Sequence, residues 1–348
     1  EALYLFLLQK REENELSQAF TAYNTRIVAP PHGSMLPMSP VRKNILMVAC
    51  ALGLLIPVVI IFICENMNTR VRGRKDLESV TVPFIGEIPL FTRKKKGIFR
   101  KKPQEVRAIV VKEGSRDIIN EAFRVLRTNL EFMTGKDKAS NVIIVTSFNP
   151  GSGKSFLTMN IAVSFAIKGK KVLVIDGDLR HGSASSYIDS PTKGLSDYLG
   201  GRIDNLNEII VTNPKQKYLD ILPVGTIPPN PTELLFDDRL KQVIDTVREQ
   251  YEYVLIDCPP IELVADTQII EKLADRTIFV VRAGLLELSM LAELEKIYGE
   301  KKYKNMSLIL NGTEGSGGRY GYRYGYRYGY HYGYGSEYHY GSDEKYIE

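Results

Sequence analysis

Residues 142–162 read VIIVTSFNPGSGKSFLTMNIA, and this stretch decides the fold. A short apolar run leads into a Pro/Gly turn, after which Lys154-Ser155 open a helical pattern. The amides of such a loop and the positive end of the helix dipole bind phosphate. The first glycine of the GxxxxGK[ST] pattern is replaced by Phe148, so the match is incomplete. The stretch favours nucleotide binding over a plain glycine-rich turn, provided that the rest of the chain supplies the structural context.

Apolar runs alternate with helical patterns from residue 142 onward. Helical patterns include residues 234–249 and 286–298, and the apolar runs are residues 142–145, 172–175, 219–222, 254–256, 278–281 and 308–310. Near-continuous apolar strands separated by helices indicate a parallel sheet covered on both faces, with ligands at the carboxyl ends of the strands. We therefore predict an α/β fold with a P-loop parallel sheet and helices on both faces.

Acidic residues follow two of these strands. VLVIDGDLR at 172–180 contains Asp176 and Asp178, and VLIDCPP at 254–260 contains Asp257. Any one of them could merely close a turn. Mg²⁺ is usually held by one or two carboxylates together with substrate phosphates. Three carboxylates beside a phosphate loop therefore predict a magnesium–nucleotide site.

An apolar segment without a charge covers residues 45–64 and is about the length that crosses a bilayer core of ~30 Å. More basic residues follow this segment than precede it, so the positive-inside bias places the C-terminal part in the cytoplasm.

The three cysteines have neither disulfide nor zinc spacing, which fits a reduced compartment. We expect five regions: a helical region with a Pro-rich linker (1–44), a transmembrane helix (45–64), a basic linker (65–103), a P-loop domain (104–314) and a tail (315–348).

The tail is a Tyr/Gly repeat with no apolar periodicity. It holds 11 of the 20 tyrosines, and its segment 319–334 carries a charge of +3 from three arginines. We expect it to be disordered when free. A sticky low-complexity tail and an Arg/Tyr tract that stacks on single-stranded nucleic acid are the competing interpretations.

Residues 113–133 form a predicted helix on which Glu121, Arg124 and Arg127 repeat every three residues. From spacing alone, an exposed salt-bridged face is the favoured interpretation.

Together, these motifs resemble those of the bacterial tyrosine kinases of the Wzc type, the polysaccharide co-polymerases. SFNPGSGKS resembles their Walker A motif, VLVIDGDLR their second motif and VLIDCPP their Walker B motif. Glu121, Arg124 and Arg127 match the ExxRxxR motif through which the family's kinase domains form rings. LPVGTIPPNPTELL at 222–235, the proline-rich stretch at 30–40 and the tyrosine-rich tail agree with the family.

The resemblance implies a role for each matched residue. Lys154, Asp176 and Asp178 would be catalytic, with Asp176 as the base, and Ser155, Asp178 and Asp257 would organise Mg²⁺. ATP would be bound by Pro150, Gly151, Ser152, Gly153, Lys154, Ser155, Phe156 and Asn311, the last reading the adenine. The phosphoacceptors would be Tyr320, Tyr322, Tyr324, Tyr326, Tyr328, Tyr330, Tyr332, Tyr334, Tyr338, Tyr340 and Tyr346.

The expected function is ATP-dependent autophosphorylation of neighbouring tails in a homo-oligomeric ring at the bacterial inner membrane. The expected partners are a tyrosine phosphatase and the machinery that polymerises and exports capsular or exopolysaccharide, with no nucleic acid. The nearest alternative is a membrane-linked P-loop ATPase of the positioning or partitioning type. Such relatives often carry a lysine near position 149, where this chain has Asn149. A co-polymerase with an inactive nucleotide site is a further alternative.

Overall fold

The computed structural model describes residues 1–20, 33, 41–66, 69–91, 108–134, 141–261 and 265–314 of the chain. The chain divides into two compact units, Glu1–Asn68 and Thr69–Glu348. The Pro-rich linker, the basic stretch 93–102 and the tyrosine tail fall wholly or almost wholly outside the described residues, so the predictions made for them stay predictions.

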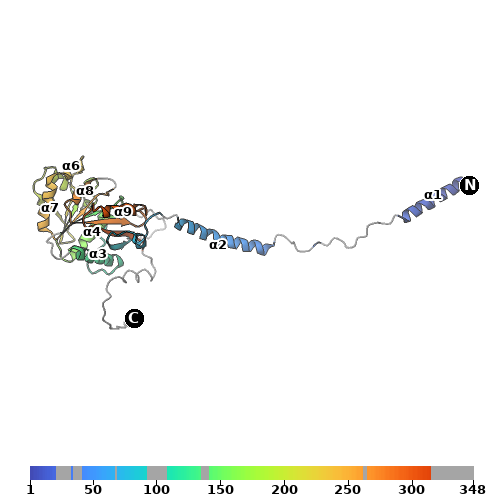
Figure 1. The fold of residues 1–348 in the computed structure, drawn as a ribbon, viewed down its shortest axis with the longest axis horizontal. Coiled ribbons are helices and arrows are strands. Elements are labelled where there is room, and N and C mark those ends of the chain that lie inside the picture. Colours follow the sequence, from blue (N-terminus) through green and yellow to red (C-terminus); the bar gives the residue numbers. More distant parts are fainter. Residues whose placement is uncertain are drawn as a thin grey trace, which may run out of the picture. The chain divides into compact units, whose positions relative to one another are not determined.

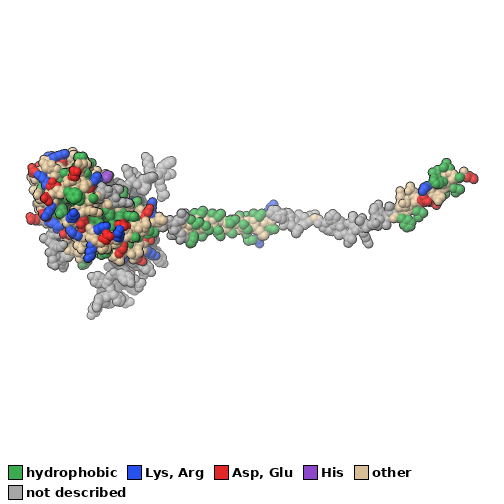
Figure 2. Space-filling view, turned by 45° about the horizontal axis from the view of Figure 1, so that its top comes forward, with side chains coloured by type: hydrophobic (Ala, Val, Ile, Leu, Met, Phe, Trp, Pro, Cys, Tyr) green, Lys and Arg blue, Asp and Glu red, His purple; other side chains and the backbone are tan. Residues whose placement is uncertain are grey.

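The first unit contains two helices, α1 (Ala2–Ala19) and α2 (Arg42–Asn66). Within α2, the 22 residues Arg42–Ile63 are long and apolar enough to cross a membrane, and none of their most apolar window is buried. Figure 2 shows this helix as a rod covered by apolar side chains. Since the cost of exposing such a surface to water is large, a lipid environment would stabilise it. The prediction of one apolar helix at 45–64 is confirmed as a candidate membrane span.

The second unit is built on an eight-stranded sheet with the order β1-β8-β7-β2-β6-β3-β5-β4. Every pair of neighbours is parallel except β4 and β5. The strands are β1 (Phe84–Pro89), β2 (Asn141–Thr146), β3 (Val172–Asp176), β4 (Val211–Thr212), β5 (Leu219–Leu222), β6 (Tyr253–Asp257), β7 (Arg276–Arg282) and β8 (Ser307–Thr313). All six strands predicted from apolar runs are present, which confirms the predicted sheet.

Helices cover both faces of this sheet. They are α3 (Ile118–Thr134), α4 (Lys154–Ile167), α5 (Leu195–Leu199), α6 (Pro231–Leu235), α7 (Asp238–Gln250), α8 (Asp266–Glu271) and α9 (Met290–Gly299). Alternate residues of β2 point to opposite faces, so Ile143 packs with the helices α3 and α4 while Ile144 packs with α7, α8 and α9. Figure 1 shows α3 and α4 on one side and α8 and α9 on the other.

Two parts of the sheet differ from the sequence-based expectation. The edge strands β1 and β4 were not predicted, and β1 lies inside the expected linker 65–103. Residues 69–91 instead belong to the same compact unit as the sheet. The amide of Val71 donates to Leu286 O at 2.9 Å, and Gly284 N donates to Val71 O at 2.7 Å. Strand β1 could not be recognised in the sequence because charged residues surround it. It is only partly buried because it lies at an edge of the sheet.

One predicted helix is divided in the structure. The pattern at 234–249 becomes α6 and α7, because Asp237 leaves the helical conformation and accepts from Arg239 N at 2.9 Å as the N-cap of α7. Asn230 directly precedes α6, and its side chain donates to Glu233 Oε2 at 3.1 Å and caps no backbone amide.

Asn160 of α4 is completely buried and holds the segment that precedes α3. Its Oδ1 accepts from Val110 N at 2.8 Å and from Val111 N at 3.2 Å, and its Nδ2 donates to Ala108 O and Phe156 O.

Asn160→Ala would leave buried backbone groups without partners, so we expect the free energy of unfolding to fall by about 2–4 kcal/mol. Urea unfolding measures this loss. The exposed control Asn207→Ala should change it by less than about 0.5 kcal/mol, and an equal effect of both variants would contradict the assignment.

Candidate functional site

The loop between β2 and α4 has the shape of a phosphate cradle. Gly151 and Gly153 have φ values of 74° and 88°, a left-handed conformation that glycine adopts without strain. A Cβ on Gly153 would also lie 2.2 Å from Nδ2 of Asn311. The loop leads directly into the N-terminus of α4, where free backbone amides and the helix dipole attract an anion.

Phe148 occupies the position of the missing first glycine because that position faces the core. Its side chain is 3% exposed, and its ring meets the ring of Phe279 edge to face at a centroid distance of 4.9 Å. Phenylalanine at this position therefore contributes to the core, while Gly151 and Gly153 keep the left-handed conformation of the loop.

Side chains at the ends of β7 and β8 hold the loop in place. Asn311 is 7% exposed and donates from Nδ2 to Ser152 O at 2.8 Å, and the guanidinium of Arg282 donates to Gly151 O. Within the loop, Ser152 Oγ donates to Asn149 O at 2.8 Å. The structure thus places Asn311 beneath the phosphate loop. Arg282 was missed by the sequence-based reasoning, since a single arginine at the end of an apolar strand carries no motif.

Phe156, which was predicted to bind the cofactor, is the third residue of α4, and its ring packs against α3. It meets the ring of Phe123 on α3 at a centroid distance of 6.1 Å.

Lys154 and Ser155 are the first two residues of α4, and Lys154 is 9% exposed. Both lie close to Asp257, where they oppose the rise in its pKa.

Asp176 and Asp257 are brought together by the sheet. They end the adjacent parallel strands β3 and β6 and stand opposite each other in the register. Both side chains are almost completely buried, and neither oxygen of Asp257 has a hydrogen-bond partner in the described part of the chain. Burial, and then the charge of Asp176, raise the pKa of Asp257. A buried carboxylate without partners is costly, which indicates a place for a cation.

Asp176 is oriented by Ser185, a residue that no sequence motif identified. Asp176 Oδ2 accepts from Ser185 N at 2.6 Å and from Ser185 Oγ at 2.7 Å. Ser185 Oγ in turn accepts from Val224 N at 2.9 Å, on the loop after β5. The other oxygen of Asp176, Oδ1, is buried and has no partner among the residues that the structure describes. Burial raises the pKa of Asp176, and the bonds from Ser185 oppose the rise.

Asp178 lies at the same edge and is 7% exposed. Its Oδ1 accepts from the amides of Arg180 and His181, both at 3.3 Å, and so closes the turn after β3. Arg180 extends from this turn to the buried Asp266 at 3.1 Å and to Thr232 Oγ1 on α6 at 3.0 Å. The turn is therefore anchored to two helices beyond the sheet.

These residues fit a magnesium–nucleotide site. In the described part of the chain, no three acidic, histidine or cysteine side chains come close enough to hold a metal alone. One carboxylate with free oxygens, a serine hydroxyl and the phosphates of a nucleotide form the usual magnesium environment in such loops. The unpartnered oxygens of Asp257 and the nearby Ser155 suit that mode of binding.

The three residues of the ExxRxxR motif lie on α3 and differ in their surroundings. Arg124 pairs with Glu121 at 3.1 Å, and the side chains of both are about 40% exposed. Arg127 points inward and donates to Ser164 O of α4 at 2.7 Å. Glu121 and Arg124 are therefore accessible to another molecule, whereas Arg127 also joins two helices of its own unit.

Comparisons with known proteins agree with this site. A family model described as an AAA domain matches residues 140–308. The chain is 33% identical over 307 residues to the putative tyrosine-protein kinase AmsA of Erwinia amylovora, which covers 85% of this chain and 41% of that protein. The chain thus spans less than half the length of the curated relatives that it matches.

Solved structures show the same fold. The kinase domain of the Escherichia coli tyrosine kinase ETK matches with a TM-score of 0.61 and 29% identity, covering 76% of this chain and all of that domain. The BceF tyrosine kinase domain matches with a TM-score of 0.58 and 30% identity, covering 70% of this chain and 99% of that domain. From the fold, the phosphate loop, the paired carboxylates and these relatives, the chain belongs to the bacterial tyrosine-protein kinase family.

Proposed function

We propose that this protein is a Mg-ATP-dependent protein-tyrosine kinase that phosphorylates the tyrosine-rich tails of neighbouring copies. The observation that carries the proposal is the position beside the phosphate loop of three buried carboxylate oxygens, Oδ1 of Asp176 and both oxygens of Asp257, that have no partner among the described residues. The chain also supplies an acceptor, since 11 tyrosines follow Gly318. The relatives named tyrosine-protein kinases support this function.

Each residue then has a defined task. Lys154 and the loop amides hold the phosphates, and Ser155 and Asp257 hold Mg²⁺ with the help of Asp178. Bound Mg-ATP supplies the phosphoryl group and a cation that neutralises its charge. The tyrosine oxygen attacks the γ-phosphorus, the bond to the leaving ADP breaks, and Oδ1 of Asp176 accepts the phenolic proton. Because free tyrosine has a pKa of about 10, a base at this position assists the reaction.

Positioning and charge neutralisation contribute most of the rate in phosphoryl transfer. Ser185 keeps one oxygen of Asp176 engaged, so that the other oxygen is held in a fixed direction. Arg282 and Asn311 likewise hold the phosphate loop in one conformation through their hydrogen bonds to its carbonyls. The site is therefore preorganised by residues that do not themselves react.

A ring formed through Glu121 and Arg124 would bring each tail to a neighbouring site. Segment 319–334 carries a charge of +3, and each phosphate adds about −1.5 to −2. Two phosphates cancel the charge, and further ones make the tail anionic. Accumulated phosphate would then weaken docking and loosen the ring, and a tyrosine phosphatase would restore it.

The proposed location is the inner membrane, with the kinase unit in the cytoplasm. Two observations support it: α2 is long and apolar enough to cross a membrane, and more basic residues follow the apolar segment than precede it. The family resemblance of the motifs assigns the protein to the regulation of capsular or exopolysaccharide polymerisation and export. A relative from Klebsiella pneumoniae is named a putative tyrosine-protein kinase in the cps region, which supports this assignment.

The alternative is an ATPase of the positioning or partitioning type without kinase activity. Asn149 stands where such ATPases often have a second lysine, and its carbonyl accepts from Ser152 within the loop. Kinase names among the relatives favour the kinase function. Phosphotyrosine formed with Mg-ATP separates the two functions, whereas ATP hydrolysis alone does not.

Transfer between copies can be tested with two full-length proteins. One carries Lys154→Met and an intact tail, and the other is active but has phenylalanine at all tail tyrosines. We expect phosphotyrosine on the Lys154→Met tail in the mixture and at least about 100-fold less of it without the partner, because Lys154 stabilises the transferred phosphoryl group. Mass spectrometry of the tail measures this, with Lys168→Met on the exposed end of α4 as the control. An unmodified tail in the mixture would exclude transfer in trans.

Asp257→Asn tests the metal site through stability. Without nucleotide, removal of a buried charge should raise the free energy of unfolding by about 1–2 kcal/mol, or the melting temperature by roughly 2–6 °C. The same variant should lose the stabilisation that Mg-ADP gives to the wild type. Calorimetry measures both effects, and exposed Asp245→Asn is the control. A melting temperature that still rises with Mg-ADP, as in the wild type, would remove Asp257 from the metal site.

Arg124→Ala should lower the mass of the oligomer measured by light scattering. It should lower the melting temperature less than Arg127→Ala does, because the Arg124 side chain is about 40% exposed and bonds to Glu121 and to Ser115 O, both near it in the sequence. Arg127→Ala should lower both, since its bond to Ser164 joins α3 to α4. Exposed Arg116→Ala is the control and should change neither. An unchanged mass for Arg124→Ala would exclude its role in the ring.

A further inference from the structure

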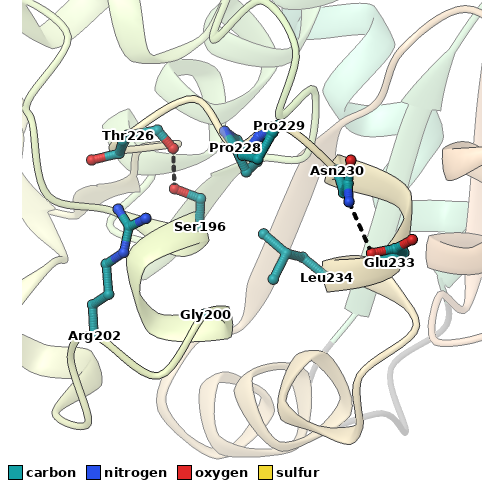
Figure 3. A pocket seen from close by; sticks show the side chains of 9 residues that line it. All are labelled: Ser196, Gly200, Arg202, Thr226, Pro228, Pro229, Asn230, Glu233 and Leu234. Atoms are coloured by element: carbon teal, nitrogen blue, oxygen red, sulfur yellow. Dashed lines mark hydrogen bonds between the residues drawn. The ribbon is translucent and has the colours of Figure 1, made fainter.

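A small pocket lies between α5 and α6, next to the active-site edge of the sheet. Figure 3 shows Leu234 pointing into it below the loop of Pro228 and Pro229, with Arg202 and Glu233 at its sides. Its volume is about 180 Å³, and an apolar cavity of about 150 Å³ holds a benzene ring. The pocket is therefore large enough for one aromatic side chain, with apolar walls and a charged rim.

The pocket is connected to the catalytic turn by hydrogen bonds. The amide of Arg180 donates to Asp178 Oδ1 at 3.3 Å, and the guanidinium of Arg180 donates to Thr232 Oγ1 at 3.0 Å. Thr232 directly precedes Glu233 on α6. Arg180 thus connects the turn that carries Asp178 to the helix that lines the pocket.

Among the charged side chains that line the pocket, one carboxylate has no oppositely charged partner in the described part of the chain. Arg202 pairs with Asp197 at 3.2 Å, so these two charges compensate each other. Glu233 accepts a hydrogen bond from the neutral amide of Asn230 at 3.1 Å, and no described cation lies within ion-pair distance of it. The pocket therefore favours a neutral phenol or a cationic peptide, and it disfavours a phosphorylated tyrosine.

The tail has a pattern that fits two separated sites. From Tyr320 to Tyr334 every even-numbered residue is tyrosine, and the odd-numbered residues are glycine, arginine or histidine. In an extended peptide, residues two apart point to the same side and are about 6.6 Å apart. A bound tail would thus present a row of phenols to the kinase surface.

We propose that the α5–α6 pocket binds a second, unmodified tyrosine of the same tail while another tyrosine occupies the active site. The ring would pack on Pro228, Pro229 and Leu234, and its hydroxyl would donate to the carboxylate of Glu233. This role rests on the proposed kinase function, which supplies the acceptor. It explains why the acceptor is a repeat: each modified tyrosine has unmodified neighbours that keep the tail docked.

The test measures binding in the absence of Mg-ATP, so that it does not depend on catalysis. The protein is the full chain with its own tail tyrosines replaced by serine. The probes are fluorescent peptides of residues 319–334, one with the natural repeat and one that keeps only Tyr326, with serine at the other tyrosines. We expect the repeat to bind about fivefold more tightly than the single-tyrosine peptide, as one additional hydrogen bond and ring contact imply.

Glu233→Ala and Leu234→Ala should reduce this ratio to nearly one, whereas Glu249→Ala on the exposed end of α7 should keep it. Because Leu234 packs partly against the core, thermal unfolding checks its fold, and exposed Glu233→Ala is the decisive variant. An unchanged ratio for Glu233→Ala, or no preference of the wild type for the repeat, would overturn the proposal. Incubation of both peptides with wild type and Mg-ATP tests the kinase function separately, because its failure would leave the binding ratio intact.

Discussion

The site depends on two carboxylates that the sheet forces together. Asp176 and Asp257 end adjacent parallel strands, so their register leaves them buried side by side. Neither could stay ionised there without compensation, and burial raises the pKa of both. Lys154 and Ser155 lie on the opposite side and supply part of that compensation. A cation and the nucleotide phosphates would complete it, so the charge pattern of the site fits a magnesium–nucleotide complex.

The rest of the unit keeps this arrangement rigid. Arg282 and Asn311 bind two carbonyls of the phosphate loop from the ends of β7 and β8. On the other side of the site, Ser185 connects Asp176 to the loop after β5 through Val224. The loop and the carboxylates are thus fixed from opposite directions by the same sheet. Such preorganisation matters most for a reaction in which the protein positions charges and forms no covalent bond to the substrate.

The sheet could be predicted from the sequence, and the candidate site residues could be selected from it, because both depend on local patterns. Apolar runs, glycines in a loop and acids at strand ends are visible in a single chain. Ser185, Arg282 and the inward contact of Arg127 were not predictable, since each depends on a partner far away in the sequence. Strand β1 was missed for a different reason: it lies at an edge among charged residues and has no continuous apolar run.

The order of the strands bears on which copy supplies the tail. The last described residue, Glu314, follows β8, whose end touches the phosphate loop through Asn311. The α5–α6 pocket lies beyond β5, on the other side of the loop-bearing strand β2. Five strand spacings separate β8 from β5, about 24 Å. A tail that starts after Glu314 has this separation to bridge before it reaches the pocket of its own copy. A tail from another copy that approaches from the β5 side has no such separation to bridge, which fits the proposed transfer between copies.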